Sequence, residues 1–226
     1  MAKSSGTSPS TVKRLFWVVI VGILLYVVLD TAAQILPPYY SPVSQAESYL
    51  AIGPYGYIMT LNFLNRGLFS LVFLYAMLRA IDLRGGVRNR YRAGVALLGV
   101  WAVGAFILAA FPTDVPPSAP TLSGAIHLVV AVISFVGGSF GALGLSLQFK
   151  RDPAFQRVTR FALPISLLAV ALVFLLFGLP GVAPAFAQRM NGLLERVFLA
   201  SVLLWMLALS VHLSGNSSLS NRAKTA

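Results

Sequence analysis

Ionisable and amide side chains interrupt several long apolar stretches of this sequence, and in combination such residues can support acid–base chemistry or ligand binding. They are Asp30, Gln34, Asn62, Asn65, Arg66, Asp114, His127, Asn191, Glu195 and Arg196. The ordinary pKa of a histidine lies near neutrality, so His127 is a candidate general acid or base, with Asp114 or Glu195 as its carboxylate partner. The same residues could instead form a structural network that fixes helix order.

A metal or haem site is not expected. The sequence has two histidines and no cysteine, which excludes disulfides, thiolate ligands and a cysteine nucleophile. His212 lies near the opposite end of its apolar stretch from the level of His127, about 25 Å away in depth at about 1.5 Å per residue. The chain also lacks the several histidines of membrane hydrolases of the ceramidase and adiponectin-receptor type. We therefore expect no metal and no cofactor.

The polar residues belong to a chain with the composition of a membrane protein. It is 58% hydrophobic and 10% charged, and its mean hydropathy is +0.82, whereas soluble domains have about 25% charged residues. Stretches of about 20 apolar residues, the length that crosses a bilayer, occupy residues 15–36, 57–80, 93–111, 123–148, 161–180 and 192–213. We predict an all-α, polytopic transmembrane bundle of six helices over residues 15–213. Residues 1–14 are expected to be a disordered cytoplasmic tail and residues 214–226 a second cytoplasmic tail.

The basic residues predict the orientation of this bundle. Fourteen of the 17 Lys and Arg residues lie in the two terminal segments and in the connections at residues 79–92 and 150–160. Loops rich in Lys and Arg stay in the cytoplasm, so both termini are predicted to be cytoplasmic. The basic loops are expected to attract anionic inner-leaflet lipids rather than nucleic acid. Nothing in the sequence specifies an oligomeric state.

The first apolar stretch has a second interpretation. Lys13-Arg14 followed by the apolar run to Leu29 fits a signal peptide, with Thr31-Ala32-Ala33 as its cleavage site. We favour an uncleaved helix, because apolarity continues through Ile35-Leu36 and because cleavage would place the basic loops outside.

In this orientation the polar residues converge on the external side of the bundle. Asn62, Asn65 and Arg66 are spaced so that they share one face of the second helix. Arg66 is the deepest charge, and an unpaired cation there would cost at least about 2.5 kcal/mol. We therefore expect an ion pair with Asp30 or, as a second choice, with Glu195.

The external loop at residues 37–56, together with Tyr57 directly after it, contains five tyrosines, which suit the level of the lipid headgroups. Ser44-Gln45-Ala46-Glu47 has the pattern of a capping box and predicts a short interfacial helix that ends at Gly53-Pro54. The loop is interpreted either as an anchor or as a ligand lid. The other external loops are expected at residues 112–122 and 181–191.

Several segments resemble a bacterial and archaeal family of six-helix membrane proteins, catalogued as domain of unknown function 998. The resemblance covers most of residues 15–213 and rests on Asn62 to Gly67, Gly94 to Asp114 with its Phe-Pro-Thr-Asp ending, Gly124 to Phe135, Ser146 to Asp152, and Gly192 to Val197. It implies an uncleaved protein of six spans in the cell membrane of a bacterium or archaeon, with no assigned reaction. Its motifs place emphasis on Asn65, Asp114, His127, Glu195 and Arg196.

Three functions remain open on the sequence alone. The leading hypothesis is an integral membrane protein without catalytic activity, whose external polar network forms a pocket for a small polar molecule or a lipid headgroup. The first alternative is a membrane-embedded, hydrolase-like enzyme that uses His127 with a carboxylate. The second is a small-solute transporter, although no polar line reaches the cytoplasmic half of the helices.

Overall fold

The computed structural model describes residues 8–83 and 88–215. This part of the chain folds into α1 (Pro9–Ile35), α2 (Gly56–Leu83), α3 (Arg92–Ala110), α4 (Leu122–Lys150), α5 (Gln156–Val182) and α6 (Pro184–Gly215), with the short 3₁₀ helices η1 (Glu47–Ala51), η2 (Arg88–Tyr91) and η3 (Pro153–Phe155). Within the described residues, six helices are long and apolar enough to cross a membrane. The predicted fold class and the number of spans are confirmed, and the protein is a multi-pass membrane protein.

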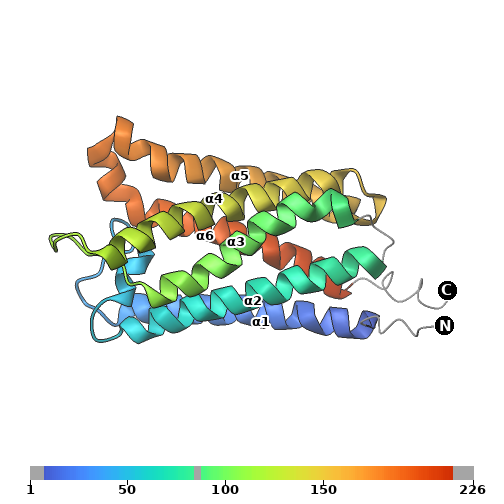
Figure 1. Ribbon diagram of the computed structural model, residues 1–226, viewed down its shortest axis with the longest axis horizontal. Coiled ribbons are helices and arrows are strands. Elements are labelled where there is room, and N and C mark those ends of the chain that lie inside the picture. Colours follow the sequence, from blue (N-terminus) through green and yellow to red (C-terminus); the bar gives the residue numbers. More distant parts are fainter. Residues whose placement is uncertain (1–7, 84–87, 216–226) are drawn as a thin grey trace.

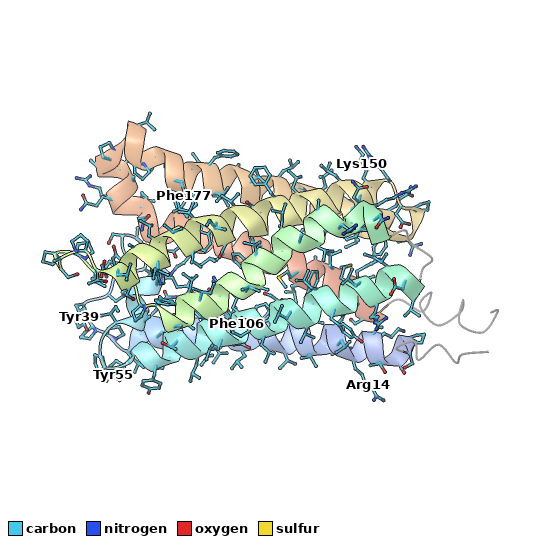
Figure 2. All side chains as sticks on the ribbon, in the orientation of Figure 1. Arg14, Tyr39, Tyr55, Phe106, Lys150 and Phe177 are labelled. Atoms are coloured by element: carbon cyan, nitrogen blue, oxygen red, sulfur yellow. The ribbon has the colours of Figure 1, made fainter. Side chains whose placement is uncertain are left out.

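The long helices form one bundle in chain order. Each packs against the next, and α6 packs against both α5 and α1, which closes the bundle (Figure 1). The start of α1 and the end of α6 lie at the same end, which we call the basic end because Arg14 and Lys150 lie there (Figure 2). The opposite end, here called the loop end, carries residues 36–55 and 111–121, including Tyr39 and Tyr55 (Figure 2).

Two helix boundaries differ from the expected ones. Helix α1 begins at Pro9, where the side chain of Ser8 accepts a hydrogen bond from the backbone N–H of Thr11, so residues 9–14 are helical; residues 1–7 and 216–226 lie outside the described part. The loop expected at residues 181–191 is also helical except near Ala183. Pro184 begins α6, a position at which the missing N–H of a proline leaves no hydrogen bond unmade.

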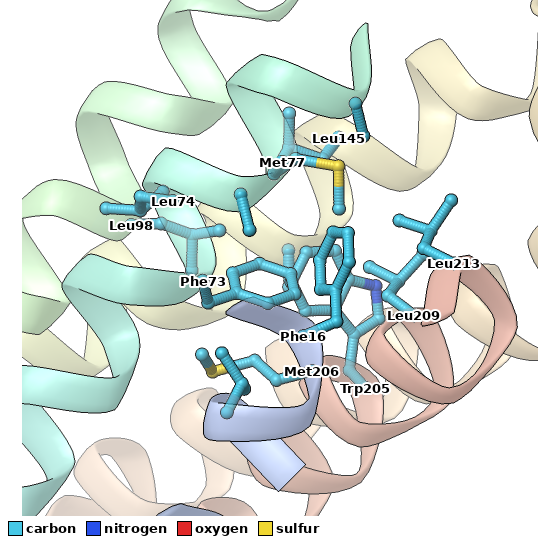
Figure 3. Packing of buried hydrophobic residues seen from close by; sticks show 14 of the residues in the cluster. Phe16, Phe73, Leu74, Met77, Leu98, Leu145, Trp205, Met206, Leu209 and Leu213 are labelled. Atoms are coloured by element: carbon cyan, nitrogen blue, oxygen red, sulfur yellow. The ribbon is translucent and has the colours of Figure 1, made fainter. Parts of the chain in front are cut away.

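The half of the bundle towards the basic end has an apolar core. Aromatic, methionine and leucine side chains from α1, α2, α3, α4 and α6 interlock there (Figure 3). The rings of Phe73 and Trp205 meet edge to face with centroids 5.6 Å apart. The indole N–H of Trp205 finds a partner in Ser146 Oγ at 2.8 Å. This core separates the loop end from the basic end.

Helices α3 and α4 approach closely through glycines of α4. A Cβ atom at Gly137 would lie 2.8 Å from the carbonyl oxygen of Leu97, and one at Gly138 would lie 2.6 Å from the ring of Trp101. Small residues allow such packing between helices in lipid. The absence of a side chain at Gly138 leaves room for the buried indole of Trp101, which contributes to the site described next.

Candidate functional site

A cavity of about 300 Å³ lies at the loop end, and we call it the loop-end cavity. Its wall includes residues of η1 and of α2 to α6. The polar side chains in the wall are those of Glu47, Ser48, Tyr49, Arg66, Thr113, His127, Asn191 and Glu195. Four of the residues that the sequence predicted for a polar network, Arg66, His127, Asn191 and Glu195, therefore surround one space.

Arg66 is 1% exposed and has no ion-pair partner among residues 8–83 and 88–215. Its Nε and Nη2 atoms also lack a hydrogen-bond acceptor there. The guanidinium carbon instead lies 4.6 Å from the ring centre of Trp101 and 5.4 Å from that of Phe63. Contacts of this kind contribute about 0.5 to 2 kcal/mol each, so aromatic rings take the place of a carboxylate.

The expected ion pair of Arg66 with Asp30 or Glu195 was therefore wrong. Asp30 accepts a hydrogen bond from Gln34 at 2.5 Å and lines a different groove, between α1 and α6. The carboxylate of Glu195 accepts the backbone N–H of Glu47 at 3.0 Å. Both carboxylates are engaged elsewhere, although Glu195 shares the cavity with Arg66.

Glu47 is a site residue that the sequence reasoning missed. Its side chain is 2% exposed and accepts a hydrogen bond from the hydroxyl of Tyr26 on α1. Burial, reinforced by the nearby carboxylates of Asp30 and Glu195, raises the pKa of Glu47 to about 8, against the opposing effects of Tyr26 and Arg66. Glu47 is therefore mostly protonated and neutral at pH 7.

The expected short helix in the first loop is present as η1, but without a capping box. Its N-cap residue is Ala46, and no side chain makes a capping hydrogen bond there. The carboxylate of Glu195 takes that role from another helix by accepting the first N–H of η1. The side chain of Glu47 is thereby free to enter the bundle.

The loop that carries η1 is docked onto α6. Arg196 Nη1 donates to the carbonyl oxygens of Pro42 at 2.9 Å and Gln45 at 3.1 Å, and Nη2 donates to the hydroxyl of Tyr40. A Cβ atom at Gly192 would lie 2.2 Å from the carbonyl oxygen of Gln45. Arg196 is thus an anchor for the loop, and the loop forms a fixed wall of the cavity.

His127 is 4% exposed, and its Nδ1 atom lies 2.7 Å from the carbonyl oxygen of Phe111. A carbonyl oxygen can only accept, so Nδ1 carries the hydrogen. In the neutral ring, Nε2 is then the unprotonated nitrogen. The arrangement leaves His127 with one basic nitrogen at the wall of the cavity.

Asp114 does not line the cavity. Its carboxylate accepts hydrogen bonds from the backbone N–H and the hydroxyl of Thr121, both at 2.8 Å, and these lower the pKa of Asp114. Thr121 is itself the N-cap of α4 and accepts from the N–H of Gly124. Asp114 therefore organises the start of α4, and Glu195 is the predicted carboxylate partner that shares the cavity with His127.

Asn62 and Asn65 join two helices. Their amide groups donate to backbone carbonyl oxygens of α1, Asn62 to Tyr26 at 3.2 Å and Asn65 to Gly22 at 2.9 Å. Neither residue lines the cavity. Their contacts fix α2 against α1, and so hold Arg66 in place, which directly follows Asn65 and lies one turn beyond Asn62.

Comparison with known proteins adds a family. Residues 20–212 match a family described as "Protein of unknown function (DUF998)". No curated protein and no solved structure matches the chain. The matched residues include parts of all six long helices and every predicted polar residue named above. Because the match covers most of its length, the chain belongs to the DUF998 family, an assignment that carries no biochemical activity.

Proposed function

We propose that this integral membrane protein binds a small polar molecule or a lipid headgroup in the loop-end cavity. The observation that carries the proposal is Arg66, a buried cation at the cavity wall without a carboxylate partner in the described structure. Removing such a charge from water costs several kcal/mol unless it is compensated. A ligand with hydrogen-bond acceptors would supply part of that compensation.

The loop end is proposed to be external. Arg14, Arg79, Lys150 and Arg160 all belong to the other end of the bundle, near the helix ends there, and basic residues favour the cytoplasmic side. The cavity would then face the outer side of a bacterial or archaeal cell membrane, with both termini in the cytoplasm. The basic end would attract anionic inner-leaflet lipids, with a contribution of about 1 kcal/mol per residue.

Binding is favoured over transport because of what lies between the cavity and the basic end. The apolar core around Phe73, Met77 and Trp205 fills that half of the bundle (Figure 3). Among the described residues, this core contains no charged side chain that a polar solute could follow through it.

A variant that fills the cavity tests the proposal. Ala131 of α4 lines the cavity, whereas Ala125 lies on the same helix, is exposed and does not line it. Purified wild type, Ala131→Phe and Ala125→Phe would be incubated with a polar lipid extract and, separately, with a pool of water-soluble phosphates and carboxylates. Bound species would then be counted by native mass spectrometry.

We expect at least one of the two mixtures to yield a bound species with wild type and Ala125→Phe that is lost with Ala131→Phe. Equal binding by all three proteins, or no binding to any of them, would contradict the proposed function. Thermal unfolding of each variant checks that a lost species does not reflect a lost fold.

A second candidate function is catalysis. The observation in its favour is that His127, with Nε2 as its basic nitrogen, and Glu195 line the same cavity. His127 would act as the general base and, once protonated, as the acid for a leaving group. Incubation with radiolabelled phospholipid would test this, because turnover must then fall by roughly a hundredfold or more in His127→Gln. Turnover that is absent, or is unchanged in the variant, would exclude this candidate.

A further inference from the structure

The loop-end cavity carries opposite charges that do not pair with each other. Arg66 and Glu195 both line it, yet they are not within ion-pair distance. The guanidinium of Arg196, the neighbour of Glu195, donates its hydrogen bonds to the loop and to the carbonyl oxygen of Gly192 rather than to that carboxylate. Among the residues that the structure describes, the cavity therefore presents one cation and one carboxylate, each without a countercharge in contact.

Glu47 is the other carboxyl group in the cavity wall, and it does not change that balance at neutral pH. The pKa of Glu47 is raised to about 8 by burial and by the carboxylates of Asp30 and Glu195. The carboxyl group of Glu47 accepts a hydrogen bond from the hydroxyl of Tyr26 and is therefore directed towards α1. A ligand that matches the cavity should thus carry one negative and one positive group.

The cavity also reaches the lipid-facing surface between α4 and α5. Leu128 of α4 and Phe177 of α5 line it although they are 62% and 39% exposed. Phe177 lies in the half of the bundle towards the loop end (Figure 2). The remaining wall on this side is apolar and includes Leu176 and Pro180. A molecule that is already in the bilayer could therefore reach the cavity sideways.

The size of the cavity restricts what it can hold. A volume of about 300 Å³ lies at the lower end of the range for ligand pockets. This is enough for a polar headgroup but not for a pair of acyl chains. The chains of a bound lipid would have to remain in the membrane, beside Leu128 and Phe177.

We infer that the loop-end cavity takes the headgroup of a phospholipid that bears a primary ammonium, of the phosphoethanolamine type. This inference rests on the proposed function and gives its ligand a chemical class. The phosphate meets the guanidinium of Arg66, whose planar N–H groups match phosphate oxygens. The ammonium, with three N–H donors, meets the carboxylate of Glu195 and the amide of Asn191. A choline headgroup lacks N–H donors, and a glycerol headgroup lacks the positive charge.

Headgroup selectivity is the direct test. Wild-type protein in detergent would receive equal amounts of phosphatidylethanolamine, phosphatidylcholine and phosphatidylglycerol with identical acyl chains, and bound lipids would be counted by native mass spectrometry. A charge-assisted hydrogen bond corresponds to roughly a tenfold or greater difference in affinity. We therefore expect about tenfold preference for phosphatidylethanolamine. Glu195→Gln, which keeps an oxygen for the N–H of Glu47, should abolish the preference, and Arg66→Met should weaken binding of all three lipids.

The lateral route is tested by two neighbouring exposed residues. Leu128 lines the cavity and Val129, 56% exposed, does not, so Leu128→Trp should reduce phosphatidylethanolamine binding several-fold and Val129→Trp should not. A further arm replaces the lipid with water-soluble phosphoethanolamine, which should bind far more weakly.

The contradictory results separate this inference from the proposed function. Equal binding of the three lipids, unaffected by Glu195→Gln, would overturn the headgroup assignment while leaving a binding cavity. Tight binding of soluble phosphoethanolamine that Leu128→Trp leaves unchanged would identify a soluble ligand and overturn the lipid route. If nothing binds and Ala131→Phe has no effect, both the inference and the proposed function fail.

Discussion

Glu47→Gln should change how the stability of the protein depends on pH. The carboxyl of Glu47 keeps its proton up to a pKa of about 8 in the folded protein, whereas its reference value is 4.5. Between these values the folded state binds more protons than the unfolded state, so stability falls as pH rises. The stabilising contribution of the raised pKa is complete below about pH 4.5 and is lost as pH approaches 8. Glutamine is a neutral isostere that can still accept from Tyr26, and it has no proton to lose.

The size of the effect follows from the same pKa. The window spans about 3.5 units, and each unit corresponds to about 1.4 kcal/mol, so the whole loss is at most about 5 kcal/mol. Between about pH 5.5 and pH 8, where the protein is readily handled, the expected loss is about 3 kcal/mol. Over this pH interval, the free energy of unfolding of Glu47→Gln should therefore rise by about 3 kcal/mol relative to that of wild type.

Unfolding in detergent micelles at a series of pH values measures this difference. Other titrating groups are common to both proteins, so the difference between wild type and Glu47→Gln isolates this carboxyl. Asp114→Asn is the matched control: the pKa of Asp114 is lowered from 3.8, so its contribution is constant above about pH 5. Parallel profiles for wild type and Glu47→Gln from pH 5.5 to 8 would refute the burial of a protonated Glu47.

The remaining predictions concern the loop, the two arginines and the orientation. Gly192→Ala should destabilise the protein by about 1 to 3 kcal/mol, because the Cβ atom of the alanine would lie 2.2 Å from the carbonyl oxygen of Gln45. The displaced loop should then be cleaved by proteases. A loop that remains resistant would contradict the docking. Arg66→Met should alter stability by no more than about 1 kcal/mol, because the loss of the ring contacts with Trp101 and Phe63 is offset by the removal of an unpaired buried charge. Arg196→Met, which removes several hydrogen bonds to the loop, should cost about 1.5 to 3 kcal/mol; equal thermal unfolding of both variants would show the assignment to be wrong. Ser118 lies on an exposed loop, so the cysteine of a Ser118→Cys variant should react with an impermeant thiol reagent added to intact cells. Labelling only after lysis would reverse the proposed orientation.

The sequence was sufficient to predict the six helices because hydropathy over about 20 residues reports directly on membrane insertion. It also located Arg66, His127, Asn191 and Glu195 at a common depth, since depth follows from position along a helix of known direction. Which side chains then face one space depends on helix rotation. Asn65 and Asp114 lie at similar depth but bond to α1 and to the start of α4.

Other features of the site depend on contacts between distant segments. Glu47 sits in a loop with a capping-box pattern, and only the docking of that loop by Arg196 and Gly192 brings its carboxyl into the bundle. The expected neighbour of Arg66 was likewise a carboxylate. Instead, the close packing of α4 against α3 at Gly138 positions Trp101, and the indole ring faces the guanidinium of Arg66. An aromatic residue on an apolar helix gives no signal of this role in the sequence.

The most direct test of the account is an experimental map of the loop end in lipid nanodiscs, for wild type and for Ala131→Phe. The account predicts non-protein density in contact with the guanidinium of Arg66 in wild type, and its absence in the variant with the helices otherwise unmoved. A closed cavity in wild type, with Arg66 paired directly to Glu195 and no density beside it, would contradict the central claim that this cavity is a ligand site.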